Sequence, residues 1–458
     1  MRTGSESLNA LERRALSGLA AVFAVRMLGL FMILPVFSPY AVQLKGHSAL
    51  LVGVALGAYG LTQAVFQIPL GMLSDRLGRK PVIVGGLLLF FLGSVVAASA
   101  DSITGVIIGR ALQGAGAIAA AVMAMLADLT RDEQRTKAML LIGITIGGAF
   151  VVSLLLGPVL DGAIGVRGIF WLTAGLALVA IALLLTAVPT PVRSTHHLDA
   201  EAAPAQFLEV LRNKELLRLD MGIFVLHMVL TALFVVVPIA LLRYAGLPVH
   251  EHWHVYLPAM ILSLLVVLPA INVGERKRKL RYVFTAAIFV LLVSQLVLFK
   301  GYQSLVWLAG ALFLFFIGFN MLEALLPSLI SKIAPVDSKG TAIGVYSTFE
   351  FLGAFIGGTT GGWLLGQYGM ASVFAFTAGL LVVWMMLSAT MREPRMVSTR
   401  LLHVGRQQPA AARELARELG RVKGVTEAIV IAEEGVAYVK VDSSELDEEA
   451  LQGFGKPR

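Results

Sequence analysis

The chain has 458 residues, of which 57% are hydrophobic and only 14% are charged, and its mean hydropathy is +0.81. A water-soluble protein of this size could not hide so much apolar surface, so the composition excludes that class and predicts a membrane protein. The absence of cysteine excludes disulfides, thiolate metal sites and thiol nucleophiles. The formal net charge of +8 needs no nucleic-acid partner, because we expect it to come from basic loops and a basic tail.

Apolar runs of about 20 residues, the length of a membrane-spanning helix, recur along the chain. We expect helices at 16–41, 49–73, 82–100, 103–127, 137–160 and 168–188, and then at 219–242, 254–273, 282–299, 303–330, 341–365 and 371–391. The sequence therefore predicts an all-α polytopic membrane protein with twelve transmembrane helices. Two six-helix halves, residues 1–188 and 219–391, are joined by a surface linker at 189–218, and a substrate site is expected at their interface.

Lys and Arg gather in alternate loops, starting with the N-terminal segment, and include Arg76, Arg131 and Lys137. Because cytoplasmic loops carry the excess of basic residues, both termini are predicted to be cytoplasmic.

The loop at 71–81, between the second and third expected helices, reads GMLSDRLGRKP. Taken alone, it could be an ordinary hairpin whose basic residues meet the anionic cytoplasmic leaflet. Its pattern Gly-x-Leu-x-Asp-Arg-x-Gly-Arg-Lys, however, resembles the signature of major facilitator superfamily transporters. The resemblance implies a charge network among Asp75, Arg79 and Asp128 that steadies the outward-facing state against helix eleven, with no good copy in the second half. We call the following residues the latch: Gly71, Asp75, Arg76, Gly78, Arg79, Lys80 and Asp128.

The fourth expected helix contains GRALQGAGA at 109–117, which places the Arg110 guanidinium inside an apolar span, where an unpaired charge is costly. The string resembles the family motif Arg-x-x-Gln-Gly-x-Gly, which implies a role in proton coupling. The structural alternative is an arginine that only donates to backbone carbonyls of the first helix.

The fifth expected helix carries glycines and a proline that permit close packing and bending, and we expect a glycine ladder that ends in a kink. Gly148, Gly157, Pro158 and Gly162 resemble part of the family's antiporter signature, although Asp161 replaces one closing glycine. A purely packing role is the alternative. Glycines at 353–362 predict that helix eleven lies close to helix two.

Polar residues inside apolar spans need a partner or a wet cavity. Tyr59, Gln63 and Gln67 are spaced by four and share a helix face, and Asn320 shares a face with Glu323. The candidates for proton coupling are Glu323, Glu350, Arg110, His227 and Arg26. The candidates for lining a central cavity are Tyr59, Gln63, Gln67, Gln113 and Asn320.

The composition becomes that of a soluble protein after Pro394, and we call residues 397–458 the module. We predict a strand at 401–404, a helix at 409–419, strands at 425–431 and 436–441 with a hairpin turn at 433–435, and a last helix, capped by Ser443 or Ser444, ending at 451. This β-α-β-β-α order resembles a small α+β ferredoxin-like domain. With His403 as its one possible ligand, metal binding is not expected; the module is predicted to bind a small ligand or a protein, or to be a stabilising appendage.

Twelve helices followed by this module resemble the YajR subfamily of the major facilitator superfamily, of the drug:proton antiporter type. The resemblance implies a monomeric secondary active transporter that exports small organic or amphipathic compounds across the bacterial inner membrane by proton-coupled alternating access. A proton symporter for a nutrient or sugar, and a membrane sensor signalling through the module, are the alternatives. An enzyme is not expected, because no catalytic group, nucleotide motif or metal-ligand spacing is present in the sequence, and no cofactor or metal is predicted.

Overall fold

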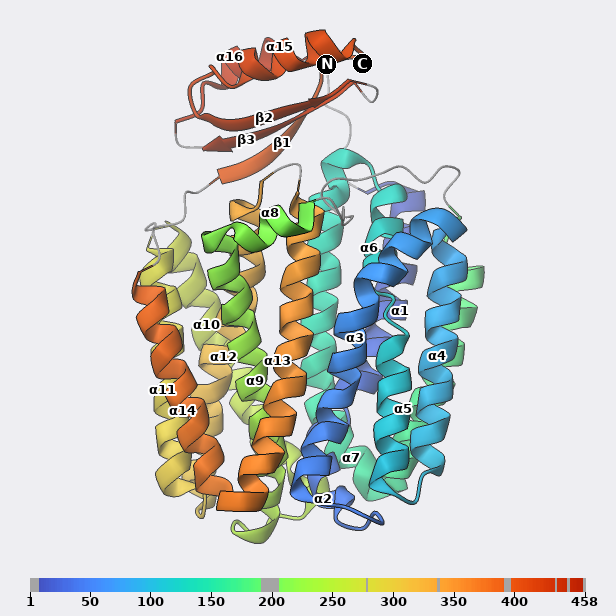
Figure 1. The fold of residues 1–458 in the computed structure, drawn as a ribbon, viewed down its shortest axis with the longest axis vertical. Coiled ribbons are helices and arrows are strands. Elements are labelled where there is room, and N and C mark those ends of the chain that lie inside the picture. Colours follow the sequence, from blue (N-terminus) through green and yellow to red (C-terminus); the bar gives the residue numbers. More distant parts are fainter. Residues whose placement is uncertain are drawn as a thin grey trace.

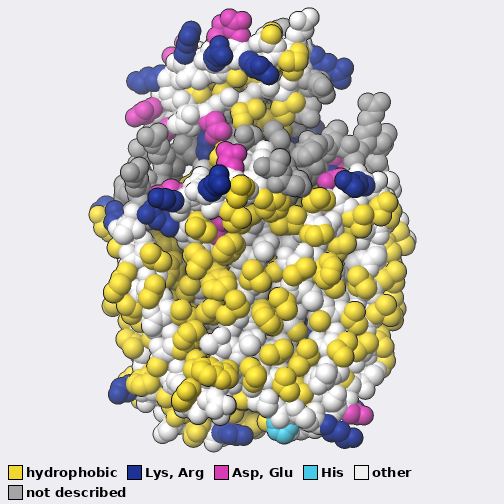
Figure 2. Space-filling model, viewed as in Figure 1, with side chains coloured by type: hydrophobic (Ala, Val, Ile, Leu, Met, Phe, Trp, Pro, Cys, Tyr) yellow, Lys and Arg dark blue, Asp and Glu magenta, His cyan; other side chains and the backbone are white. Residues whose placement is uncertain are grey.

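The computed structural model describes residues 8–190, 206–276, 279–335, 338–390, 397–432, 435–442 and 445–455. Long helices form a bundle, and the small module lies at one end of it, which we call the module end; the opposite end is the distal end (Figure 1). Hydrophobic side chains cover the middle of the visible face, whereas charged side chains gather at the two ends (Figure 2). This is the surface expected of a protein that spans a bilayer.

The helices of the first half depart from the predicted bounds at three points. The first begins at Ala10, because Asn9 and Glu12 form a capping box, and it ends before a turn that contains Pro35. The fourth is divided at Gly116, and the fifth and sixth are continuous except at Gly165, where φ is 67°. The helices are α1 (Ala10–Phe31), α2 (Phe37–Ala41), α3 (Ala49–Leu77), α4 (Arg79–Ser99), α5 (Ile103–Ala115), α6 (Ala119–Asp128) and α7 (Asp132–Thr186).

The second half follows the predicted helices within a few residues at most ends. Its elements are α8 (Phe207–Arg212), α9 (Lys214–Arg243), η2 (Val249–Glu251), α10 (Trp253–Arg276), α11 (Leu280–Gly301), α12 (Leu305–Ile333), α13 (Lys339–Tyr368) and α14 (Met370–Ala389). Among the described residues, ten helical segments are long and apolar enough to cross a membrane. This number counts the two joined helices of α7 as one segment and does not include α13. Separating those two and adding α13 accounts for the twelve predicted helices. Half of the linker, residues 191–205, lies outside the described residues.

Helix α13 packs between α3 and α9 through two rows of glycine. A Cβ atom added to Gly53 of α3 would lie 1.9 Å from the carbonyl oxygen of Gly358, and one added to Gly357 would lie 2.2 Å from that of Met228 in α9. No side chain fits at such distances, so small residues are required where these backbones meet. The prediction that helix eleven lies close to helix two is confirmed, and α9 is a second partner.

The two halves also touch at the distal end. The Ser38 hydroxyl donates to the Phe234 carbonyl at 3.0 Å, which joins α2 to α9. A Cβ atom added to Gly162 of α7 would lie 2.7 Å from the Cβ of His250 in η2. The distal end is therefore held together by contacts from both halves.

The module is a three-stranded antiparallel sheet in the order β1-β3-β2, with helices on one side of it (Figure 1). Its elements are β1 (Val397–His403), α15 (Pro409–Leu419), β2 (Val425–Ile431), β3 (Val436–Asp442) and α16 (Glu448–Gln452). This is the predicted β-α-β-β-α order. The predicted cap is wrong, because Asp447 caps α16 by accepting from the Ala450 amide. Residues 433, 434, 443 and 444, which include most of the predicted hairpin turn, lie outside the described residues.

Candidate functional site

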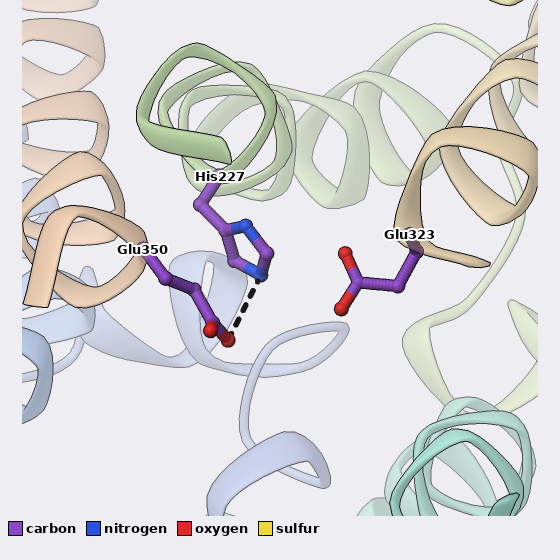
Figure 3. Close-up of side chains that lie close together, drawn as sticks. All are labelled: His227, Glu323 and Glu350. Atoms are coloured by element: carbon purple, nitrogen blue, oxygen red, sulfur yellow. Dashed lines mark ion pairs between the residues drawn. The ribbon is translucent and has the colours of Figure 1, made fainter. Parts of the chain in front are cut away.

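Three ionisable side chains from three helices of the second half face one another inside the bundle. His227 of α9, Glu350 of α13 and Glu323 of α12 bring an imidazole nitrogen and two carboxylate oxygens within 4.8 Å of one another (Figure 3). His227 Nε2 lies 3.5 Å from Glu350 Oε1. His227 Nδ1 lies 3.4 Å from the Ile223 carbonyl oxygen, which can only accept, so a hydrogen bond there requires the proton on Nδ1 and leaves Nε2 toward the acids.

Glu323 and Glu350 are partly buried, and Glu323 Oε2 accepts no hydrogen bond from the described residues. An ionised pair of carboxylates in such a place is costly unless a cation or proton accompanies it. The same three groups could also surround a metal ion. Spacing along the sequence could not reveal this cluster, because its three residues lie far apart along the chain.

Asn320 does not join this cluster, although it was placed on the same helix face as Glu323. Its amide nitrogen donates to the Ser263 hydroxyl at 2.9 Å, which directs it toward α10. Gln67 and Gln63 also have different partners, because Gln67 donates to the Thr348 hydroxyl of α13 at 2.9 Å, whereas Gln63 accepts from Arg26. The polar residues that share a helix face in the sequence therefore do not line one common cavity surface, because they bind different neighbouring helices.

Arg26 and Arg110 lie buried in the first half, each 1% exposed. Arg26 of α1 donates to Gln63 Oε1 at 2.6 Å and to the Gly116 carbonyl at 3.1 Å, at the break between α5 and α6. Arg110 of α5 donates to Gln113 Oε1 at 3.0 Å. The structural alternative for Arg110 is not supported, because this hydrogen bond goes to its own helix and not to carbonyls of the first helix.

Tyr59 of α3 lies between the two arginines. Its ring centre is 5.7 Å from the guanidinium carbon of Arg26 and 5.2 Å from that of Arg110, which is within range for cation–π attraction. Tyr59 also contacts Phe351 of α13, with ring centres 6.3 Å apart. Tyr59 therefore links the arginine group of the first half to α13, the helix that also carries Glu350.

The charged latch residues come together at the module end. Arg79, which is 3% exposed, donates through Nε to Asp128 Oδ2 at 3.0 Å and through Nη1 to Asp75. Ser74, which the sequence reading missed, accepts from Arg79 Nη1 at 2.9 Å. Gly78, with φ of 94°, makes the turn that places Arg79 at the start of α4.

The latch faces the first turns of α13 across a cavity of about 120 Å³, lined on one side by Gly71, Asp75 and Arg79 and on the other by Gly340 and Gly344. Because the N-terminus of a helix carries partial positive charge, Asp75 is favourably placed beside it. The alternative of an ordinary hairpin expects the basic residues of this loop to face the anionic lipid headgroups. Two of them instead bind other parts of the protein. Arg79 is buried among the acids, and Lys80 donates to the Val188 carbonyl at 2.6 Å, whereas Arg76 is exposed.

The glycines of α7 differ in their surroundings. Gly148 has no atom within 4 Å of an added Cβ, whereas one added to Gly157 would lie 2.4 Å from the Met32 carbonyl. The predicted ladder is therefore wrong at Gly148 and holds at Gly157 and Gly162. The helical dihedral angles continue through Pro158, and the break falls at Gly165, because a positive φ ends the helix there.

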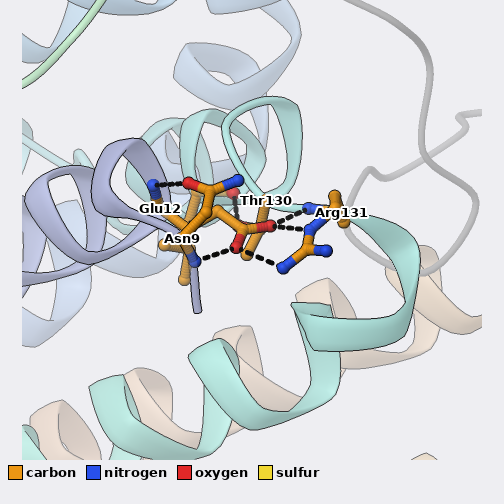
Figure 4. Close-up of polar contacts among 5 residues, drawn as sticks. Asn9, Glu12, Thr130 and Arg131 are labelled. Atoms are coloured by element: carbon orange, nitrogen blue, oxygen red, sulfur yellow. Dashed lines mark hydrogen bonds and ion pairs between the residues drawn. The ribbon is translucent and has the colours of Figure 1, made fainter. Parts of the chain in front are cut away.

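An ion pair that the sequence reading missed joins the start of α1 to the start of α7 (Figure 4). Glu12, whose side chain is 2% exposed, accepts from the backbone nitrogen, Nε and Nη2 of Arg131 at 2.8 to 3.0 Å. The spacing of Asn9 and Glu12, typical of a capping box, could have located the start of α1, but not the pairing with a residue so distant in sequence.

A second missed contact joins the module to the bundle. Lys440 of β3 is 8% exposed and donates to the carbonyl oxygens of Ala334 at 2.8 Å and Ile333 at 3.4 Å, at the C-terminal end of α12. A cation at this end of a helix is favoured by the helix dipole. Burial lowers the pKa of Lys440 from its usual 10.5, and the nearby positive charge of Lys339 lowers it further, against the attraction of Glu427.

Comparisons with known proteins agree with this architecture. The profile of the Major Facilitator Superfamily matches residues 19–358, and that of the YajR YAM domain matches residues 407–447. The inner membrane transport protein YajR of Escherichia coli strain K12 is 48% identical over 434 residues, which cover 94% of this chain and 95% of that protein. The multidrug resistance protein MdtH of Aeromonas hydrophila is 27% identical, over 82% of this chain and 95% of its own length.

Among solved structures, a mutant of the nucleoside transporter NupG superposes with a TM-score of 0.66 at 13% identity, covering 82% of this chain and 99% of that one. At this identity the likeness concerns the fold alone. The family points to a membrane transporter and not to an enzyme. The chain therefore belongs to the major facilitator superfamily, and it carries a YajR-type YAM domain after its membrane helices.

Proposed function

We propose that this transporter exports a small organic or amphipathic compound in exchange for protons, by alternating access at the bacterial inner membrane. The observation that carries the proposal is the meeting of His227, Glu323 and Glu350 inside the second half. Three groups that can each gain or lose a proton, set in a membrane interior where net charge is costly, couple proton binding to the conformation around them. Arg26 and Arg110 supply fixed positive charge on the other side of the contact between α3 and α13.

The two halves, residues 1–188 and 219–391, are proposed to move against each other about this contact. Protonation of Glu323 or Glu350 changes the charge of the interface, and the latch sets which state is favoured. The latch residues lie beside the first turns of α13, so separation of the halves at the module end disturbs their contact with that helix. Gly157 and Gly162, which touch neighbouring segments closely, are proposed to guide the movement of α7.

We place the module and both termini in the cytoplasm, because the basic loops lie at the module end. The Lys440 contact supports a regulatory role for the module: α12 carries Glu323, and its C-terminal carbonyls are held by the module. A small ligand or protein that binds the module would act on the transporter by breaking or strengthening this contact. The transporter is proposed to work as a monomer.

Export is favoured over uptake because MdtH, a relative along most of the chain, is named as a multidrug resistance protein. A nutrient symporter and a sensor without transport are less well supported. The test is a screen for compounds that raise the unfolding temperature of the purified protein, followed by proteoliposomes that contain a pH-sensitive dye. An exporter coupled to protons moves protons when such a compound is added, and Glu323→Gln abolishes that movement. Compound movement without proton movement would contradict the proposal.

A further inference from the structure

Within the described part of the chain, every polar atom left without a partner around Arg26 and Arg110 can donate a hydrogen bond, and only the Tyr59 hydroxyl can also accept one. Among the described residues, no partner is present for Nε and Nη1 of Arg26, Nε and Nη2 of Arg110, the Tyr59 hydroxyl or the Gln63 amide nitrogen. The acceptor atoms of Gln63 and Gln113 are already used by the two arginines. The group therefore offers donors in excess and needs acceptors from elsewhere.

The same group carries two positive charges that no acid balances. The hydrogen bonds and ring contacts of Arg26 and Arg110 go to glutamine, a backbone carbonyl, Tyr59 and Phe90, and none goes to a carboxylate among the described residues. Guanidinium groups stay charged in proteins, and at 1% exposure they cannot be hydrated well. Water would satisfy donors but would leave both charges uncompensated.

We propose that Arg26 and Arg110 bind an anionic group of the transported compound, with Tyr59 and Gln63 as further donors. A carboxylate fits this arrangement, because its two oxygens only accept hydrogen bonds and pair well with guanidinium donors. The rings of Tyr59 and Phe90, which lie within 6.0 Å of a guanidinium carbon, provide an apolar wall for the remainder of the compound. The compound enters and leaves as the halves separate.

This inference rests on the proposed function only in that the chain is a transporter; it does not need proton coupling. The first test measures thermal unfolding of the purified full-length protein with benzoate or with benzamide, its uncharged analogue of nearly the same shape, at constant ionic strength. We expect benzoate to raise the unfolding midpoint in proportion to the logarithm of its concentration and benzamide to have little effect. Equal shifts from the two compounds would overturn the proposal.

The variants Arg26→Gln and Arg110→Gln should each abolish the benzoate shift, and Arg110→Lys should restore part of it. Arg167→Gln is the matched control, because Arg167 is half-exposed and pairs with Asp101 between α4 and α5. Without benzoate, the two glutamine variants should unfold at the same or a higher temperature, since they remove an unbalanced buried charge. A benzoate shift that persists in both glutamine variants would overturn the proposal, as would a lowered midpoint in both, which indicates purely structural arginines.

A second test measures amide hydrogen exchange of the wild-type protein, so its result does not depend on whether the variants fold. Benzoate should slow exchange in α1 and α5 more than benzamide does, and equal protection by both would contradict the anion site. Benzoate binding without any pH-dependent movement of the halves would refute proton coupling alone. Proton coupling without selective benzoate binding would refute the anion site alone.

Discussion

The latch allows a population shift to be predicted from buried charge. Asp128→Asn keeps the shape of the side chain but removes the charge that faces Arg79, and the two side chains are 0% and 2% exposed. Removing one partner of a buried ion pair costs about 3–5 kcal/mol. Arg79 keeps Asp75 and Ser74, so we expect about 2 kcal/mol, or roughly a 30-fold shift, toward the state that is open at the module end.

The assay is the distance between two spin labels at the module end, for example at Leu140→Cys in α7 and Tyr282→Cys in α11, both on exposed positions. The labels attach only there, because the chain has no cysteine. Asp101→Asn is the control, since this acid pairs with an exposed arginine outside the latch and should leave the distances unchanged. An Asp128→Asn shift below about threefold, or no larger than that of the control, would refute the reasoning.

Three further predictions concern packing, the N-terminal ion pair and the module. Gly53→Leu should destabilise the protein by about 3 kcal/mol or more, because its Cβ meets the backbone of α13, whereas Gly379→Leu, with open space around it, should not. Glu12→Gln should lower stability by about 2 kcal/mol, because it removes the charge of a buried acceptor that takes several partly buried hydrogen bonds. The pKa of Lys440 is lowered when the residue contacts α12, so the docked module binds fewer protons than the free module. The contact should therefore strengthen as pH rises from the lowered pKa toward 10.5, and it should not change with pH below the lowered pKa. Lys440→Arg should remove this pH dependence.

Thermal or denaturant unfolding measures the first two of these, and a spin-label distance between module and bundle measures the third. Equal effects of the two leucine variants would contradict the packing of α3 on α13. An unchanged midpoint for Glu12→Gln would mean that the Arg131 pair contributes no net stability. A module that approaches the bundle as pH falls would reverse the sign expected from burial of Lys440.

The twelve helices and the order of the module could be predicted because each follows from local pattern: apolar length, alternation and turn residues. Asp75, Arg79 and Asp128 were joined through the resemblance of one loop to a family signature. The helix breaks were harder to foresee. Pro158 is a stronger local signal than Gly165, yet the chain turns at Gly165, where the positive φ is tolerated.

The site depends on contacts between residues distant in sequence, which local pattern does not record. Glu323 and Asn320 share a helix, but Asn320 turns to Ser263 while Glu323 turns to His227. Nothing in the local pattern around Lys440 indicates its hydrogen bond to the end of α12, because that bond depends on how the module packs on the bundle.

The central claim is that protons drive the alternation through the acidic cluster. It is tested most directly by measuring spin-label distances at the distal end, at Val42→Cys and Tyr368→Cys, across a pH series in wild type and in Glu323→Gln. Both positions are exposed, and Glu215→Gln, which changes a partly exposed acid at the start of α9, is the control. We predict a pH-dependent exchange between two distances in wild type and in the control, and a single pH-independent distribution in Glu323→Gln. An unchanged pH response in Glu323→Gln would contradict the account.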